Sequence, residues 1–493
     1  MKALSIRKKL GFVFGIGAFL FILSAPVPTG MNPIAMKAAA VSVLMAVFWV
    51  TEAVSIFATA FIPIALFPVL GVLNSKQIAE SYGNHIVLLI LGAFFVAKAI
   101  ETNGLHKRIA LGTIKVVGIS RPKIILSFMI ATGFLSMWTS NNSTTLMMLP
   151  IALAIITREE KMGSDVSRFG PALMLSIAYS ASIGGTGTLV GTPPNLVFAS
   201  ILKEVFPKSP DVLFVDWLKI GIPFVLIFIP IAWVYLVRFF NVSGKLHGSE
   251  RIIHDEYRSL GQMTAAEKRV LCVVCFYALG FVFRKWWSGI LGVEAFAKDS
   301  TVAFVAALFL FALPSGRKNN KGNNTNLLEW DDAKNIPWAI AMLIGGGLAI
   351  ASAFKHSGLV DWIGSTASLE GTSPVLVVFL VVGGMVFLTE INSNTATTAV
   401  FLPVLAGLSK AGGFHPFLLM VPATIAASCA FMLPSGTGPN ASVLASGQLT
   451  IPQMARAGLG LNIIVIIVIT LVLYGFIIPV LGIDPKVAPV WIN

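Results

Sequence analysis

Charged residues are scarce in this chain. Only 12% of its 493 residues are Asp, Glu, Lys or Arg, whereas 56% are hydrophobic and the mean hydropathy is +0.85. Soluble domains average about 25% charged residues, so the composition excludes an ordinary soluble domain. Apolar runs of roughly 17 to 25 residues, long enough to cross a bilayer as helices, recur along the whole length. The sequence therefore predicts an all-α polytopic membrane protein.

Cysteine and histidine are also rare, with three and six residues. Cys272 and Cys275 have a C-x-x-C spacing, but no histidine or further cysteine lies near them, so neither a metal site nor a redox pair is expected. The glycines of 345–347 are not followed by the Gly-Lys-Ser/Thr of a phosphate-binding loop. We find no nucleophile, metal cluster or acid–base pair, and the chain is not expected to be an enzyme.

Basic residues exceed acidic ones, and the net charge is +13. They lie in short loops between apolar runs, which favours the positive-inside rule over nucleic-acid binding. Lys2, Arg7, Lys8 and Lys9 precede a first apolar run that we interpret as a retained span, because no cleavable signal is evident. We expect the N-terminus in the cytoplasm and the protein in the inner membrane of a bacterial cell.

Eleven apolar segments are predicted to be membrane spans. They are 10–28, 33–50, 53–73, 86–101, 170–202, 218–240, 269–287, 299–314, 336–354, 416–450 and 457–480. The segments 170–202 and 416–450 contain Gly and Pro interruptions and are expected to be broken helices. Two further apolar stretches, 124–157 and 375–408, carry polar residues at their middle, which leaves halves of about 15 residues, too short to cross comfortably. We expect these two stretches to form re-entrant hairpins.

The same polar motif stands at the middle of both predicted hairpins. It reads S-N-N-S-T-T over 140–145 and S-N-T-A-T-T over 393–398, a spacing of 253 residues (393 − 140). Hairpin tips leave backbone groups unpaired; helix N-termini favour anions, and freed carbonyls favour cations. Small polar residues also serve helix packing in membranes. Two corresponding clusters, however, favour a functional site.

The repeat extends beyond this motif. Gly-Thr-Pro-Pro-Asn at 191–195 returns as Gly-Thr-Gly-Pro-Asn at 436–440, and Gly and Ala positions of 92–109 return in 346–363. Three ordered blocks with nearly one spacing are unlikely to arise by chance. Each half of the chain is therefore expected to pair a hairpin tip with a broken helix.

The two copies differ in the charge of their flanking loops. The loop 102–123 is strongly basic, whereas its counterpart 355–374 carries Asp361 and Glu370. By the positive-inside rule the copies lie on opposite sides of the membrane. This predicts an inverted-topology repeat, as found in secondary transporters.

Side chains near the tips can bind ions without carrying formal charge. Ser136 and Thr389 correspond to one another, and each lies four residues before the serine of its motif, so that its hydroxyl can face the same pocket. Hydroxyl, amide and carbonyl oxygens can hold Na⁺, a hard cation, while backbone N–H groups can hold a carboxylate. We expect one cation site in each half.

A set of motifs then points to a family. They are Ser140-Asn141 with Thr144-Thr145, S-N-T-A-T-T of 393–398, G-G-T-G-T of 184–188, T-P-P-N of 192–195, Pro337-Trp338 with the glycines of 345–347, and 415–434 from His415-Pro416 to Leu433-Pro434. Together they resemble the divalent anion/Na⁺ symporter family, the INDY-like dicarboxylate and citrate carriers, over residues 40–480. The resemblance implies a homodimer, a scaffold part, and a transport part that moves by an elevator mechanism.

The resemblance also implies the binding residues, with substrate held between the two tips and one Na⁺ behind each. Substrate contacts fall on Ser140, Asn141, Asn142, Ser393, Asn394 and Thr395, flanked by Thr192, Pro193, Thr437 and Pro439. The first Na⁺ site falls on Ser136, Ser140, Asn141 and Gly191, with the choice among the glycines of 184–191 left open. The second falls on Thr389, Asn392, Asn394 and Gly436.

Two positions depart from the family pattern. Asn142 replaces the threonine of the first Ser-Asn-Thr, and Gly438 stands where the family usually has proline. The amide of Asn142 is bulkier than a hydroxyl and has more hydrogen-bonding capacity, which bears on substrate identity more than on ion coupling. Glu390, three residues before Ser393, is either a functional carboxylate or a hydrogen-bond partner that holds the hairpin.

The sequence thus predicts Na⁺-coupled symport of a dicarboxylate such as succinate, malate or fumarate, or of citrate. A cation-independent anion exchanger and an anion channel are the alternatives. Neither tip carries a His or Lys that could replace the cation, which favours symport. The expected division is scaffold helices over 1–85, a first repeat core over 86–202, scaffold helices with a connector (241–268) over 203–335, a second repeat core over 336–450, and a C-terminal helix over 451–493.

Overall fold

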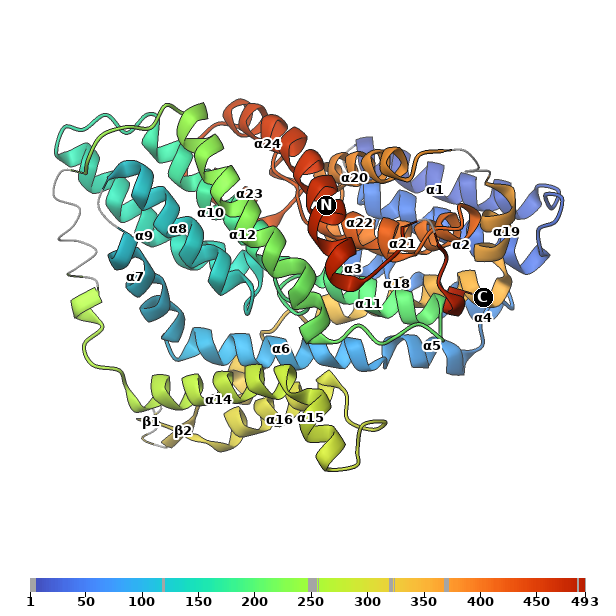
Figure 1. Cartoon of the computed structure of the whole chain (residues 1–493), viewed down its shortest axis with the longest axis horizontal. Coiled ribbons are helices and arrows are strands. Elements are labelled where there is room, and N and C mark those ends of the chain that lie inside the picture. Colours follow the sequence, from blue (N-terminus) through green and yellow to red (C-terminus); the bar gives the residue numbers. More distant parts are fainter. Residues whose placement is uncertain are drawn as a thin grey trace.

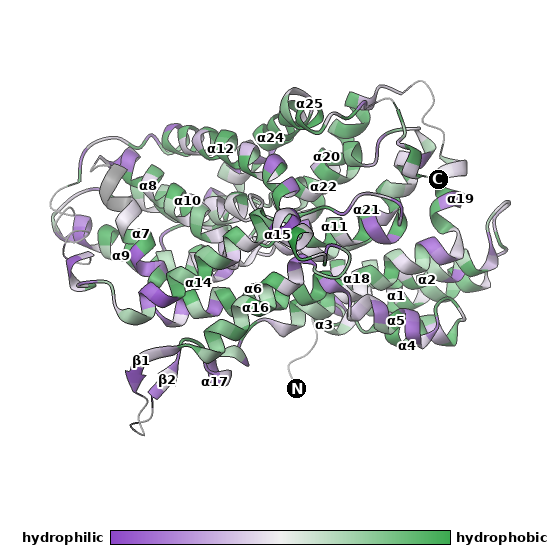
Figure 2. Cartoon of the chain, turned by 60° about the horizontal axis from the view of Figure 1, so that its bottom comes forward, coloured by the Kyte–Doolittle hydropathy of each residue, from purple (hydrophilic) through white to green (hydrophobic). Residues whose placement is uncertain are grey.

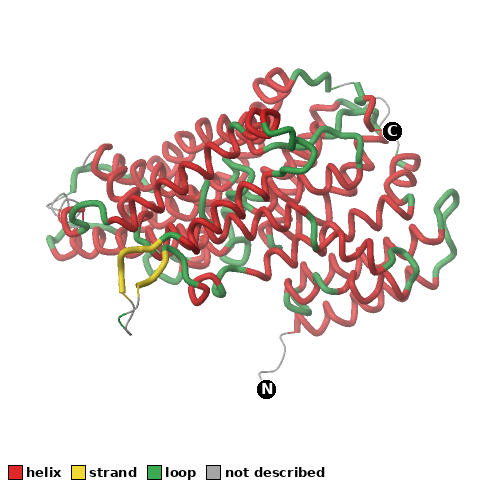
Figure 3. The backbone as a smooth tube through the Cα atoms, turned by 90° about the horizontal axis from the view of Figure 1, so that it is seen from below, coloured by secondary structure: helices red, strands yellow, loops and turns green. Residues whose placement is uncertain are grey.

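The computed structural model describes residues 6–117, 120–246, 255, 257–318, 322, 324–367, 372–485 and 487–492. Most of these residues form helices joined by loops, and the named strands are one short antiparallel hairpin of β1 (Pro314–Lys318) and β2 (Asn324–Asn326) (Figure 3). The all-α prediction therefore holds except at this hairpin. Within the predicted connector 241–268, residues 247–254 and 256 lie outside the described residues, as does Glu370.

Six helices are long and apolar enough to cross a membrane. They are Pro33–Thr51, Ser75–Thr102, Phe214–Phe239, Trp338–His356, Pro374–Ile391 and Ile451–Leu481. Figure 2 shows hydrophobic residues along most helices and hydrophilic ones gathered at β1 and β2. These helices support a multi-pass membrane protein, while the number of eleven spans remains a prediction.

The predicted span 53–73 is not one continuous helix. The chain forms two short helices there, α3 (Ile56–Thr59) and α4 (Ile62–Val69). The Tyr82 hydroxyl, from α5 (Ser75–Tyr82), donates to the Ala60 carbonyl between them. Pro63, the second residue of α4, has no N–H to bond back to α3, so the helical ladder cannot continue through it.

Both hairpins form as predicted in shape. Helices α8 (Arg121–Ser136) and α9 (Asn141–Lys161) make the first, and α20 (Pro374–Ile391) and α21 (Asn394–Ala411) make the second. Their lengths are 16, 21, 18 and 18 residues, and of the four only Pro374–Ile391 is long and apolar enough to cross a membrane. That the hairpins are re-entrant remains a prediction.

Both broken helices are confirmed. The first consists of α10 (Phe169–Gly185) and α11 (Pro193–Val205), and the second of α22 (Phe417–Ala427) and α23 (Gly438–Leu444). The half before each break packs on the hairpin of its own repeat: α10 on α8 and α9, α22 on α20 and α21. The half after the break crosses to the other repeat, so that α11 packs on α21 and α23 packs on α9. This crossing brings both tips and both breaks to one place.

The remaining helices surround this centre (Figure 1). They are α1 (Ile6–Ser24), α2 (Pro33–Thr51), α6 (His85–Thr102), α7 (Leu105–Val117), α12 (Phe214–Phe239), α14 (Ala265–Val282), α15 (Arg284–Ile290), α16 (Asp299–Ala312), α17 (Trp330–Ala333), α18 (Trp338–Ser357), α19 (Leu359–Thr366), α24 (Ile451–Val472), a π-helical turn η1 (Leu473–Ile477), α25 (Ile478–Leu481) and a 3₁₀ turn η2 (Val490–Ile492). Helix α6 packs on α16, and α18 packs on α21 and α11. Helices α6 and α18 thereby flank the site described next.

Candidate functional site

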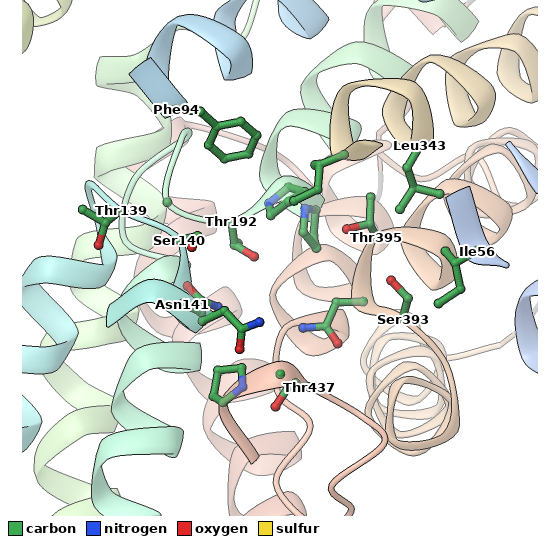
Figure 4. A pocket seen from close by; sticks show the side chains of 18 of the residues that line it. Ile56, Phe94, Thr139, Ser140, Asn141, Thr192, Leu343, Ser393, Thr395 and Thr437 are labelled. Carbon is green, nitrogen blue, oxygen red and sulfur yellow. The ribbon is translucent and has the colours of Figure 1, made fainter. Parts of the chain in front are cut away.

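A pocket of about 360 Å³ lies where the hairpin tips meet the helix breaks (Figure 4). All ten residues predicted to contact substrate line it: Ser140, Asn141, Asn142, Thr192, Pro193, Ser393, Asn394, Thr395, Thr437 and Pro439. The glycines predicted for the two Na⁺ sites, Gly191 and Gly436, line it as well. Apolar side chains such as Phe94 and Leu343 form the opposite wall. The structure therefore gathers residues that are more than 250 apart in sequence.

Four helices begin at this pocket. Ser140, Thr192, Ser393 and Thr437 each occupy the position just before a helix, those of α9, α11, α21 and α23. Helix N-termini present unpaired N–H groups and favour negative charge. Glu52 is the one charged side chain among the described residues that line the pocket. An anion bound here would be held by backbone N–H groups, hydroxyls and amides.

A cluster of three oxygens lies behind the first tip. The buried Ser136 Oγ is 2.7 Å from Asn141 Oδ1 and 2.7 Å from the Ala181 carbonyl oxygen. A hydroxyl carries one hydrogen, so it can donate to only one of these acceptors at a time. The hydroxyl oxygen and the acceptor to which it does not donate therefore repel each other, and a bound cation would offset this repulsion.

The second tip repeats this arrangement. Thr389 Oγ1 is 2.7 Å from Asn394 Oδ1 and 2.7 Å from the Ala427 carbonyl oxygen, and it too is buried. Within the described part of the chain no group of three or more His, Cys, Asp or Glu could hold a metal. The oxygens at both tips are neutral, which suits Na⁺ better than a transition metal.

The glycines of the breaks allow the backbone to approach the tips. A Cβ added at Gly191 would lie 2.5 Å from the Gly185 carbonyl oxygen and 3.1 Å from that of Ser136. A Cβ at Gly436 would lie 3.1 Å from the Glu390 carbonyl oxygen. Among the glycines of 184–191, Gly185 lies closest to the first oxygen cluster, because Asn141 Oδ1 is the nearest atom to a Cβ built there, whereas Gly191 lies against the backbone carbonyls of Gly185 and Ser136.

Asn392 is placed differently from the other predicted ligands. Its Oδ1 accepts a hydrogen bond from the Ser393 N–H at 2.8 Å, and its side chain lines a separate, largely apolar pocket beside α2. It therefore stands on the far side of the tip from the substrate pocket. Its predicted part in the second Na⁺ site would need its carbonyl oxygen or a change of rotamer.

Asn195 and Asn440 hold the two breaks, which the sequence did not reveal. The Nδ2 of Asn195 donates to the Thr188 carbonyl at 2.7 Å, and that of Asn440 donates to the Leu433 carbonyl at 3.0 Å. The Oδ1 atoms of both are buried without a partner. Their place in the repeated Gly-Thr-x-Pro-Asn was the available signal, since corresponding asparagines in two breaks indicate a common role.

Glu390 proves to be a hydrogen-bond acceptor for the second break. Its Oε1 accepts from the N–H groups of Phe431 and Met432 at 2.7 and 2.9 Å and from Asn462 Nδ2 at 2.8 Å. Its Oε2 accepts from the Leu433 N–H at 2.9 Å. Glu390 is thus the hydrogen-bond partner that one of the two predictions expected, but three of its donors come from the second break and one from α24, none from the hairpin.

Some known proteins are similar to this chain in sequence, and others are similar to it in fold. The sequence profile described as the sodium:sulfate symporter transmembrane region matches residues 7–482. The sodium-dependent dicarboxylate transporter SdcS of Staphylococcus saprophyticus is 39% identical over 492 residues, which cover 98% of this chain and 94% of that protein. SdcS of Staphylococcus aureus is 38% identical over 492 residues, which again cover 98% of this chain and 94% of that protein.

Two solved structures share the fold at low identity. The antimetabolite efflux pump MtrF of Neisseria gonorrhoeae has a TM-score of 0.58 at 12% identity, covering 99% of this chain and 98% of MtrF. The Alcanivorax borkumensis YdaH transporter has a TM-score of 0.53 at 11% identity, covering 97% of each chain. The profile match and the identity to SdcS carry the assignment: this chain belongs to the sodium:sulfate symporter family, the divalent anion/Na⁺ symporters that its motifs resemble.

Proposed function

We propose that this protein is a secondary transporter that couples Na⁺ entry to the uptake of a C4 dicarboxylate such as succinate, malate or fumarate, with citrate as a further substrate to test. The observation that supports this function is a pocket at four helix N-termini whose two hairpin tips carry only uncharged polar side chains, with an oxygen cluster behind each tip. The name of the relative SdcS, a sodium-dependent dicarboxylate transporter, supports the substrate class. A dicarboxylate dianion carried with two Na⁺ has no net charge and is driven by the Na⁺ concentration gradient alone, whereas a third Na⁺ adds about 2.3 kcal/mol per 100 mV of membrane potential.

The amides of Asn141 and Asn394 are the proposed link between ion and substrate. Each amide has its Oδ1 at the oxygen cluster and belongs to a residue that lines the pocket. The Nδ2 of a planar amide points away from its oxygen, and it can donate to a substrate carboxylate while the oxygen binds Na⁺. Bound Na⁺ would fix the amide in this orientation, so ion binding prepares the anion site.

We further infer the larger architecture that the resemblance implies. It includes eleven spans with two re-entrant hairpins, an inverted repeat, a homodimer and an elevator motion. The transport part would comprise 86–202 and 336–450, and the scaffold 1–85 and 203–335. The crossing of α11 and α23 between repeats supports a single moving unit that contains both tips. The N-terminus would lie in the cytoplasm and the protein in the bacterial inner membrane.

Uptake of radiolabelled succinate into proteoliposomes tests this function. We expect accumulation with an imposed inward Na⁺ gradient and only background uptake when choline replaces Na⁺. Equal uptake in both conditions would refute symport and favour cation-independent exchange. Competition by unlabelled malate, fumarate, citrate and sulfate then ranks the anions, and sulfate displacing succinate better than malate would contradict the dicarboxylate assignment.

A further inference from the structure

We propose that Asn142 and Gly438 form a matched pair across the two repeats, in which the Asn142 amide is a specificity-determining contact for one end of the substrate. The substrate contact rests on the proposed function, whereas the pairing of Asn142 with Gly438 depends only on how the two residues pack. Asn142 lies in the first turn of α9, and Gly438 is the first residue of α23, which packs on α9. Both residues line the pocket.

Asn142 occupies the space where a side chain at 438 would be. A Cβ built on Gly438 would lie 2.5 Å from both Cγ and Nδ2 of Asn142 and closest of all to its Oδ1. Real Cβ atoms do not approach so near, because van der Waals repulsion rises steeply at such distances. Any residue larger than glycine at 438 therefore requires the amide to move.

The backbone gives no other reason for glycine at this position. Gly438 is not among the glycines with positive φ, and it occupies the first position of a helix, where proline is favoured. Thr437 has φ −143° and ψ 150°, an extended conformation that a following proline also requires. The corresponding Thr192, at φ −142° and ψ 141°, is in fact followed by Pro193. The Asn142 contact thus accounts for the glycine.

In the other repeat the larger residue follows the break and the smaller one lies in the hairpin. There the first residue of the helix after the break is Pro193, and the hairpin position that corresponds to Asn142 is Thr395. One side of the pocket therefore combines a proline ring with a hydroxyl, and the other combines a bare backbone with an amide. The two ends of the pocket therefore differ in side-chain size and in hydrogen-bonding groups, although the motifs around it repeat.

The Asn142 amide is free to bind a ligand. The side chain is exposed toward the pocket, and no hydrogen bond to it exists within the described residues. Asn141 and Asn394, by contrast, have their oxygens engaged by Ser136 and Thr389. The Nδ2 of Asn142 can donate to a carboxylate oxygen, so this amide holds the substrate carboxylate at the α23 end of the pocket.

A double-mutant cycle tests the pairing. We expect Gly438→Pro to lower the melting temperature of the purified protein and to reduce Na⁺-driven succinate kcat/KM more than tenfold, because the ring collides with the amide. We expect Asn142→Thr to fold normally and to raise the succinate KM about tenfold, as the loss of a hydrogen bond to a carboxylate does. The double variant should regain the stability lost by Gly438→Pro and transport like Asn142→Thr. Additive losses in the double variant, or normal behaviour of Gly438→Pro, would overturn the pairing.

Asn142→Asp tests the contact with substrate separately. Asp has the shape of Asn but repels a carboxylate, so transport should fall much further than in Asn142→Thr while the Na⁺ concentration for half-maximal rate stays within twofold. A near-normal succinate KM in Asn142→Asp would refute the contact. The melting temperatures of the cycle are measured without substrate, so the pairing is judged even if the wild-type protein fails to transport dicarboxylates. In that case only the proposed function would be lost.

Discussion

Removal of the Glu390 carboxylate should destabilise the second half of the site. Glu390 is 3% exposed and accepts four hydrogen bonds, three from the backbone of 431–433 and one from Asn462. A bond to a charged group contributes about 1.5 to 3 kcal/mol, and an unsatisfied buried donor costs about 1 to 3 kcal/mol. Glu390→Gln keeps one acceptor oxygen but turns an N–H₂ toward a donor, and we expect it to cost about 2 to 3 kcal/mol. Glu390→Ala leaves all four donors without their acceptor and should cost more than about 4 kcal/mol.

Thermal unfolding of the purified protein in detergent measures this effect. The melting temperature should fall in the order wild type, Glu390→Gln, Glu390→Ala, with a drop of roughly 2 to 3 °C for the Gln variant. Asn462→Leu is the matched control, because it removes one donor and leaves the carboxylate with the three backbone donors. Its loss should be smaller, and combining it with Glu390→Gln should be less than additive. Wild-type melting in the Gln and Ala variants would refute the holding role, and lost transport at unchanged stability would make Glu390 a functional carboxylate instead.

Three further predictions address the ions, the breaks and pH. Ser136→Ala and Thr389→Val should each raise the Na⁺ concentration needed for half-maximal succinate uptake about tenfold or more, since each removes an oxygen from a cluster; unchanged Na⁺ dependence in both would place the ions elsewhere. Gly191→Ala should impair transport more than Gly436→Ala, because its nearest carbonyl oxygen lies at 2.5 Å rather than 3.1 Å from the added Cβ; uptake rates in the reverse order would contradict this. Burial lowers the pKa of His415 to about 4, so the unfolded chain binds the extra proton first and stability should fall as pH drops from about 6.5 toward 4. Melting temperatures at pH 7 and pH 5 should therefore differ less in His415→Phe than in wild type, and an equal difference would exclude His415 as the cause.

The polar residues of the site could be predicted because they interrupt apolar sequence. Ser140 and Ser393 begin clusters that a bilayer core would not otherwise tolerate, and their repetition supplied the pairing. Three of the four partners of Glu390 could not be predicted, because they are backbone N–H groups of 431–433, which every residue other than proline possesses. A break in a helix frees such groups without changing the residue types that carry them.

The crossing of the repeats was also hidden from the sequence. Helix α11 is apolar on the face that meets α21, but an apolar helix in a membrane protein does not reveal which neighbour it contacts. The correspondence of Pro193 with Gly438 and of Thr395 with Asn142 was visible as two separate departures from a pattern. Only the packing of α23 on α9 shows that the two are in contact.

The position of Glu390 constrains the order in which the chain can be assembled in a membrane. The first of its donors lies 41 residues further along the chain and Asn462 lies 72 residues further, so α20 is synthesised before any of them. Glu390 is the second-last residue of α20, and an acidic side chain costs about 2.5 to 3.5 kcal/mol at the centre of an inserting helix and less toward its ends. The corresponding residue of the first hairpin is Met137, which carries no such cost. The first hairpin can therefore settle while synthesis continues, whereas Glu390 of the second gains its first donors only when 431–433 have been made and its last with Asn462, and a chain truncated before Phe431 would leave this acid without any of them.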